Sequence, residues 1–186
     1  MKKQVLVFVL GVFILPLGAM AQDHSGHSMK MNNDETTVKH YEVSANFQQQ
    51  LNAVYKASLA LNKSFTASDA TSVKEFTATL ISSVSKVDMT LLKGEAHMAW
   101  MKYLKPISAE LAKIKVSDDI EEQRKAYVTV SDGLYKAVKS FGVGETVYYQ
   151  YCPMAKASWL NDSNDVNNPY YGSKMLKCGF VKEVIN

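Results

Sequence analysis

Both cysteines of this chain lie in two short stretches near its C-terminus, YCPM at residues 151–154 and NPYYGSKMLKCG at residues 168–179. A methionine follows Cys152 after one intervening residue, and another precedes Cys178 by three positions. Thiolate and thioether sulfurs are soft ligands that select Cu(I) and related metals. The surrounding segment, residues 145–186, is also rich in Tyr, Asn, Pro and Gly. We therefore expect it to carry the functional site and the preceding residues to support it.

Four segments with helical periodicity precede this stretch, between residues 41 and 144. Their apolar residues recur at the i, i+3, i+4 and i+7 spacing that places side chains on one face of a helix. The main apolar positions are Phe47, Leu51, Val54, Tyr55 and Leu59; Val73, Phe76, Leu80, Val84 and Val87; Leu92, Ala96, Trp100, Leu104, Ile107, Leu111 and Ile114; and Ile120, Tyr127, Leu134, Val138 and Phe141. Thr66 with Asp69, and Asp118 with Glu121, resemble helix-start signals. Pro106 is expected to kink or split the third helix.

These patterns predict a mainly α fold, an antiparallel up-down four-helix bundle followed by a loop-rich segment. Residues 146–151 and 180–185 are β-branched or aromatic and predict two short strands that can pair as a hairpin. Such a ribbon is marginally stable alone, so we expect it to pack on the bundle. Residues 41–144 and 145–186 then form one domain.

The first 21 residues resemble a cleaved secretory signal. Lys2 and Lys3 precede an apolar run at residues 5–17, and Ala19 and Ala21 form a small-x-small cleavage site. The alternative is a membrane anchor, but the run is shorter than the ~20 residues that a spanning helix needs. We expect an exported, periplasmic protein. Its formal net charge of +3 is too small to predict a nucleic-acid-binding surface.

Residues 22–40 are polar and lack aliphatic periodicity, which predicts a disordered arm. Within this arm, His24, His27, Met29 and Met31 lie close together in the sequence. A short His-rich tract suggests a secondary metal site, in which Cu(II) is the expected ion because it favours nitrogen ligands. The alternative is a solvated tail whose His and Met residues have no function.

The third predicted helix adds two candidate ligands. His97 and Met101 are separated by four residues and therefore share a helix face, next to Trp100. Residues of these types are more often packing or surface residues than ligands. We expect them to face the sulfur-rich segment, so that Cys152, Met154, Met175, Cys178, His97 and Met101 surround one copper ion, with Trp100 shielding the site from water.

The two cysteines leave two alternatives open. Cys152 and Cys178 either bind metal as thiolates or form a disulfide, which an exported protein permits. Neither a CxxC motif nor a nucleophile with an oxyanion-hole signature is recognisable, so we expect no enzyme activity.

The chain resembles a family of exported domains of unknown function. The resemblance rests on residues 91–101, 151–155, 159–160 and 168–179, and it extends from about Tyr41 to Val184. These domains occur alone or fused to the C-terminus of periplasmic adaptor subunits of copper/silver-type heavy-metal efflux pumps. The resemblance implies copper binding and an efflux adaptor as the partner. The chain departs from the family at Tyr151, where the family often has His.

Together these observations predict an exported copper carrier or buffer associated with metal efflux, with Cu(I) held by Cys, Met and His side chains. The alternative is a helical interaction module stapled by a Cys152–Cys178 disulfide, without bound metal.

Overall fold

A computed structural model describes residues 38–186 of the chain. In this part, the helices are α1 (Ala45–Ala67), α2 (Ala70–Ser85), α3 (Gly94–Val116) and α4 (Ile120–Phe141). Short 3-10 turns, η1 (Met89–Leu91) and η2 (Gly172–Lys174), lie between larger elements. The strands β1 (Val147–Cys152), β2 (Ala157–Asn161) and β3 (Phe180–Ile185) complete the fold. The predicted mainly helical class is confirmed.

Side-chain caps start three of the helices, because the first N–H groups of a helix lack partners within it. Ser44 accepts from the Phe47 amide, Asp69 from the amides of Thr71 and Ser72, and Asp119 from that of Glu121. Two predicted start signals are corrected. The cap of α2 is Asp69 and not Thr66, which belongs to the last turn of α1, and the cap of α4 is Asp119 and not Asp118.

Helix α3 continues through Pro106 as one helix, so of the two expected effects, a kink or a split, the split does not occur. A proline at this position removes the hydrogen bond to the carbonyl of Lys102. Both Lys102 and Pro106 are exposed, so water can bind the released carbonyl and the helix tolerates the loss.

The helices share one apolar core. Helix α1 packs on α2, α2 on α3, and α3 on α4, and α1 also contacts α4. The rings of Phe47, Trp100 and Phe141 meet edge to face, with centroids 5.3 to 6.3 Å apart. Among the predicted core positions, Phe76 is exposed, and its neighbour Thr77 is fully buried instead. None of the helices in the described residues has the length and apolar character needed to cross a membrane.

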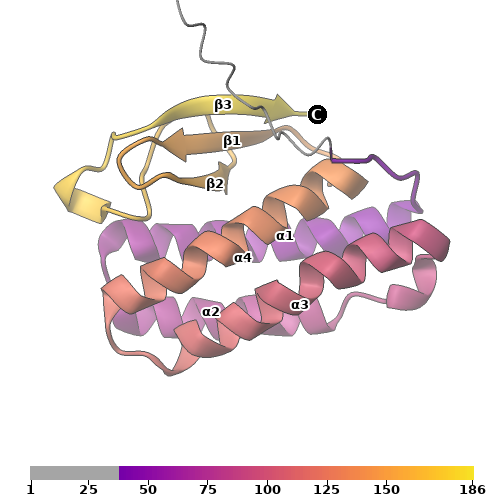
Figure 1. The fold of residues 1–186 in the computed structure, drawn as a ribbon, viewed down its shortest axis with the longest axis horizontal. Helices are drawn as coiled ribbons and strands as arrows, with labels where there is room; N and C mark the ends of the chain where they lie inside the picture. The colour runs from indigo at the N-terminus through magenta and orange to yellow at the C-terminus, as the bar shows by residue number, and fades with distance from the viewer. Residues whose placement is uncertain (1–37) are drawn as a thin grey trace, which may run out of the picture. The chain divides into compact units, whose positions relative to one another are not determined.

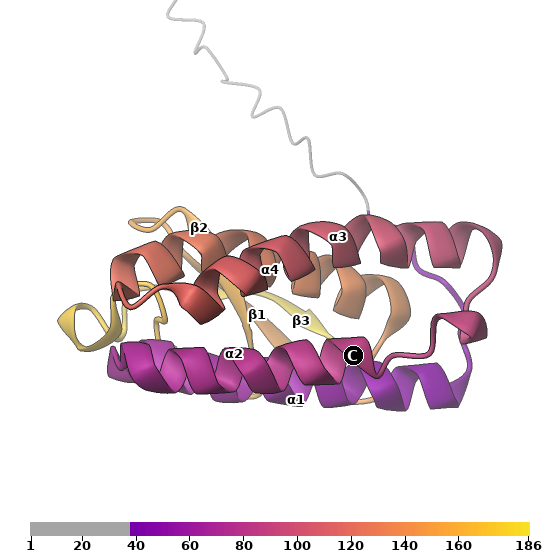
Figure 2. The same ribbon diagram turned by 90° about the horizontal axis from the view of Figure 1, so that it is seen from below.

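The three strands form an antiparallel sheet in the order β2-β1-β3 (Figure 1). The predicted pairing of the first and last strands is confirmed, with Tyr148 opposite Val184 and Tyr151 opposite Phe180. Strand β2 was not predicted. The sheet lies against α4 and α1 (Figure 1), where Asn62 of α1 donates to the carbonyl of Leu160 at 2.7 Å. Seen from below, α2 and α3 cover the side of the helices opposite the sheet (Figure 2).

Candidate functional site

The structure brings the two cysteines into contact at one end of the sheet. The Sγ atoms of Cys152 and Cys178 are 3.2 Å apart. This is longer than the ~2.05 Å of a disulfide bond, and both residues are free thiols in the structure. Cys152 is fully buried, whereas Cys178 is partly exposed. One sulfur is therefore anchored in the core, and the other lies between the core and solvent.

Strand pairing places Cys152. It is the last residue of β1 and pairs with Ala157 of β2, and its side chain points towards the core because alternate residues of a strand face opposite sides. The chain turns immediately afterwards, and the amide of Ala155 donates to the Cys152 sulfur at 3.4 Å.

Asn168 places Cys178. The Asn168 side chain is fully buried, and its Nδ2 donates to the carbonyl oxygen of Cys178 at 2.7 Å. Its Oδ1 accepts from the backbone amides of Tyr170 and Tyr171, at 2.8 and 3.3 Å. Its own amide donates to the carbonyl of Leu176. One buried amide side chain therefore closes the loop that ends at Cys178. Sequence reasoning missed this role, although an Asn before a Pro is a turn signal that could have indicated it.

The two thiols have unequal acidity. Burial by itself raises the pKa of the Cys152 thiol, but hydrogen bonds from the Ala155 amide, from Cys178 and from Asn168 outweigh it and lower the pKa below its usual range. The hydrogen bond to Cys152 raises the pKa of Cys178. The contact between the two sulfurs therefore favours the loss of one proton from the pair and opposes the loss of the second.

The two neighbouring methionines are not core residues. Met154 is 63% exposed and Met175 is 38% exposed. Met175 lies within one turn of Cys178, whose amide donates to the Met175 carbonyl at 3.0 Å. Their thioethers therefore lie at the surface, where they are accessible to solvent.

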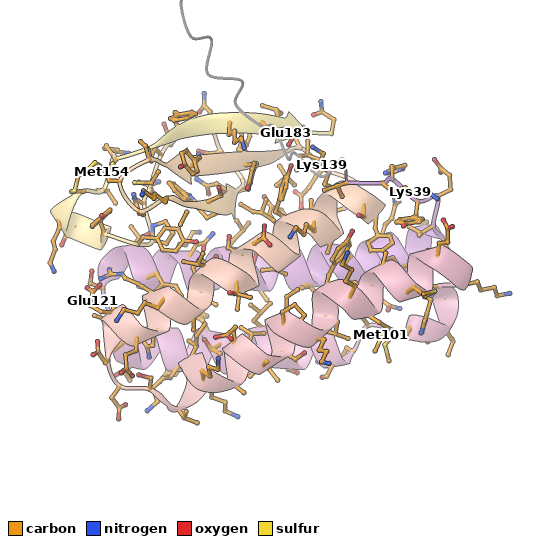
Figure 3. The ribbon with its side chains drawn as sticks, viewed as in Figure 1. Lys39, Met101, Glu121, Lys139, Met154 and Glu183 are labelled. Carbon is orange, nitrogen blue, oxygen red and sulfur yellow. The ribbon has the colours of Figure 1, made fainter. Side chains whose placement is uncertain are left out.

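The structure does not bring His97 and Met101 to the cysteines. Both lie on α3, which packs on α2 and α4, while β2 packs on α4. Figure 3 shows Met101 on α3 well apart from Met154 beside the sheet. The nearest hydrogen-bonding partner of the His97 ring is the carbonyl of Met89, 3.4 Å from Nδ1. We therefore leave both residues out of the candidate site.

Trp100 is also absent from this site, because its ring belongs to the aromatic core with Phe47 and Phe141. The indole of Trp159 in β2 lies beside Gly179, the residue that follows Cys178. A side chain built at Gly179, next to Cys178, would meet the Trp159 ring at 2.9 Å. Gly179 therefore allows the loop to pass close to this ring.

The part of the chain that matches a known protein family consists mainly of the helices. Residues 54–146 match a family described as "Protein of unknown function (DUF3347)". This chain belongs to that family. The match extends from the middle of α1 to the residue before β1, so it includes His97 and Met101 but neither cysteine. No curated protein and no solved structure matches the chain. The family assignment therefore agrees with a domain of unknown function and leaves its chemistry to the residues themselves.

The donor atoms at this site are sulfur atoms. Within residues 38–186, no cluster of three or more His, Cys, Asp or Glu side chains is arranged to hold a metal. Two thiols with thioethers in the adjoining sequence suit a soft ion of low coordination number such as Cu(I). In an oxidising compartment, an oxidant that removes two electrons and two protons can also convert the two thiols to a disulfide, which needs the sulfurs to approach from 3.2 Å to about 2.05 Å. The arm residues His24, His27, Met29 and Met31 lie outside the described residues.

Proposed function

We propose that the protein is an exported carrier or buffer of Cu(I), without enzyme activity, that works with a heavy-metal efflux system. Cys152 and Cys178 hold the ion, and the thioethers of Met154 and Met175 assist. The observation that carries this proposal is the 3.2 Å contact between two thiols, one of which is more acidic than an ordinary cysteine. An acidic thiol favours metal binding because the thiolate is the form that binds.

The thiol separation is compatible with one shared ion. A metal–thiolate bond is about 2.3 Å long, so two thiolates can lie up to about 4.6 Å apart when the ion is between them. The observed separation of 3.2 Å between the two Sγ atoms must therefore increase towards this upper limit when an ion binds between them. Cys178 can supply the movement because it is only partly buried and precedes Gly179, whose φ is +146°.

Exposure of the thioethers supports a role in transfer. An ion bound by the buried sulfur of Cys152 and the partly exposed sulfur of Cys178 can pass to the exposed thioethers of Met154 and Met175. A partner protein can then take the ion from these thioethers with its own ligands. The partner we propose is a periplasmic efflux adaptor. The four helices, taken as the antiparallel up-down bundle predicted from the sequence, provide a rigid base for the sheet.

The experiment is Cu(I) competition against a chromogenic chelator, with the reduced protein lacking residues 1–21. Loss of an outer-shell partner typically lowers metal affinity 10–100-fold, so Cys152→Ser or Cys178→Ser should lower it by at least about 100-fold. Met154→Leu with Met175→Leu keeps the side-chain volume and should lower affinity by about tenfold. The matched control is Met98→Leu with Met101→Leu, which changes two exposed methionines on α3.

The competing function is a protein-interaction module that is cross-linked by a Cys152–Cys178 disulfide. The 3.2 Å contact between the two Sγ atoms favours this function equally, because the sulfurs are also close to the separation of a disulfide bond. Titration of free thiols in the native protein separates the two proposals. A protein purified with no free thiol, and with Cu(I) affinity that neither cysteine substitution changes, would support the stapled module.

For the N-terminal arm we propose a separate Cu(II) site. Cleavage after Ala21 would leave Gln22, Asp23 and His24 as the first residues. A free amine, two amides and the His24 imidazole would then offer the square-planar nitrogen ligands that Cu(II) prefers. His27, Met29 and Met31 would hold the ion after reduction. Visible spectra during Cu(II) titration test this site, and an unchanged spectrum for His24→Ala would refute it.

A further inference from the structure

The methionines of the described chain all lie at its surface. Residues 38–186 contain five methionines, and each of them is between 38% and 71% exposed. Every leucine in the same residues is buried or half-buried. Leucine and methionine have similar volumes and are both usually buried, so packing alone does not separate them in this way. What distinguishes methionine is its thioether sulfur, a soft ligand for ions such as Cu(I).

The exposed methionines form two groups in different parts of the fold. Met154 and Met175 adjoin the cysteines in the sequence, and the other three lie in η1 and the first turns of α3, together with His97. Figure 3 shows that Met101 of the second group is well apart from Met154. The second group therefore needs an explanation that does not involve the cysteines.

Helix geometry brings one imidazole and two thioethers together on α3. Met101 follows His97 by four residues and Met98 by three, so it is a neighbour of both on the helix surface, with Cβ atoms about 5–6 Å apart. Side chains of a helix lean towards its N-terminus, and on that side lies Gly94. A Cβ built at Gly94 would meet no atom of the described chain within 4 Å. The helix surface beneath these side chains is therefore open to an ion from solvent.

The η1 turn orients the imidazole ring of His97. Its Nδ1 atom lies 3.4 Å from the carbonyl oxygen of Met89. A carbonyl oxygen can only accept a hydrogen bond, so Nδ1 carries the proton and the lone pair of the neutral ring is on Nε2. Metal-binding histidines usually donate their other ring N–H to a carbonyl or carboxylate in this way. The contact therefore gives His97 the tautomer of a metal ligand.

We propose that His97, Met98 and Met101 form a second Cu(I) site, which uses neither cysteine. The Nε2 atom and two thioether sulfurs supply three neutral donors, a set that suits a soft ion of low coordination number. Neutral donors attract the ion less strongly than two thiolates, because they carry no charge. The site on α3 should therefore fill after the cysteines.

The test is an anaerobic Cu(I) titration of the reduced protein lacking residues 1–21, with ¹³C-labelled methionine methyl groups followed by NMR. Met98→Leu and Met101→Leu assign the two signals and keep the side-chain volume. Both signals should shift together, after those of the two methionines beside the cysteines. Met89 is the matched control thioether, because it is 39% exposed and Met101 is 41% exposed, and its signal should shift far less. The two sites are read from different signals, so either proposal can fail without the other.

Two histidine variants test the imidazole. Loss of an outer-shell partner alone typically lowers metal affinity 10–100-fold, so His97→Ala should weaken binding at Met98 and Met101 at least about tenfold. His40→Ala changes another exposed histidine and should leave this binding unchanged. The proposal is overturned if the Met98 and Met101 signals do not shift at three equivalents of Cu(I), if Met89 shifts as much, or if the two histidine variants bind alike.

The double variant Met98→Leu with Met101→Leu separates the two sites. Competition with a chelator reports the tighter thiolate site, so there the double variant remains a control. In the titration, the same variant should abolish the shift of the His97 ring resonances. A His97 shift that persists without both thioethers would overturn the proposed ligand set.

Discussion

The Nδ2 atom of Asn168 donates a hydrogen bond of 2.7 Å to the carbonyl oxygen of Cys178. Since Asn168 is fully buried and also accepts from the amides of Tyr170 and Tyr171, it ties both ends of one loop together. It also contributes to the low pKa of the Cys152 thiol. The position of Cys178 relative to Cys152 therefore depends on a residue that is not itself a candidate ligand.

Asn168→Asp should destabilise the protein by about 2–4 kcal/mol. The substitution keeps an acceptor for the two tyrosine amides but removes the donor to Cys178 and buries a charge. It should also raise the pKa of Cys152. Urea unfolding and thiolate absorbance measure the two effects. Asn167→Asp is the control, because within residues 38–186 the Asn167 side chain has one hydrogen-bond partner, the exposed Lys177, which donates to it. Equal effects of the two substitutions would contradict this role.

Cys152→Ser should lower the pKa of Cys178. The largest cause of the raised pKa of Cys178 is its hydrogen bond to the Cys152 sulfur, and the negative charge of that sulfur adds to it. A serine hydroxyl does not ionise at the pH where thiols titrate, so the charge disappears and the proton leaves Cys178 more easily. Ultraviolet absorbance of the thiolate against pH measures this change. A pKa for Cys178 that stays the same or rises would show that the thiols do not interact.

Arg124→Met should destabilise the protein by about 2–4 kcal/mol. Arg124 is 5% exposed and donates to the carbonyls of Pro169 and Phe65, at 3.0 Å each. Methionine fills much of the volume but leaves both carbonyls without this donor. The loop that carries Cys178 would then lose its anchor to α4. Lys125→Met, on the exposed side of α4, is the control and should change the unfolding free energy by less than about 0.5 kcal/mol. Similar unfolding midpoints for both variants would argue against this anchor.

Gly172→Ala should be more destabilising than Gly144→Ala. Both glycines have positive φ, +55° and +74°, so alanine costs about 1–2 kcal/mol of backbone strain at either position. At Gly172 a Cβ atom would also meet Ser68 Oγ at 2.3 Å and Arg124 Nη2 at 2.8 Å. At Gly144 it would meet no atom of the described chain within 4 Å. Thermal unfolding of the two variants should therefore differ, and equal melting temperatures would exclude the close packing at Gly172.

Alkaline pH should destabilise the protein through Tyr135. Burial is the main cause that raises the pKa of Tyr135 to about 12. An unfolded tyrosine ionises at about 10, so above that pH the unfolded state loses a proton that the folded state keeps. Stability is therefore lost as the pH rises from about 10 to 12. Tyr135→Phe should flatten this part of the urea-midpoint profile, and an unchanged slope would contradict the prediction.

The helices could be predicted because their signals are local. Periodic positions such as Leu51, Leu80 and Leu134 are buried as expected. The prediction that Phe76 is buried is wrong, because periodicity locates the buried face of a helix only approximately. Thr77 occupies the buried position instead. Strand β2 was missed because residues 157–161, ASWLN, contain no β-branched residue. This strand is formed through its pairing with β1 and its contact with α4.

The candidate site was only partly predictable, because it depends on which distant segments pack together and not on local spacing. The spacing of His97 and Met101 shows that they share a helix face, but it does not show which element packs over that face. Strand β2 packs on α4 and accepts hydrogen bonds from Tyr55 and Asn62 of α1, so α3 carries His97 and Met101 away from the cysteines. Contact between Cys152 and Cys178 required the pairing of β1 with β3 and the loop closed by Asn168.

The sequence alone determined the helical class and the segment that holds both thiols of the chain. It also placed two of the helix caps, one within three positions and the other within one. These depend on residues within a few positions of each other, where chain geometry limits the possible contacts. Only the tertiary structure decided that the two sulfurs meet at 3.2 Å, that Met154 and Met175 are exposed, and that His97 lies elsewhere. These depend on which faces of distant segments bury each other, which is a property of the packed chain as a whole.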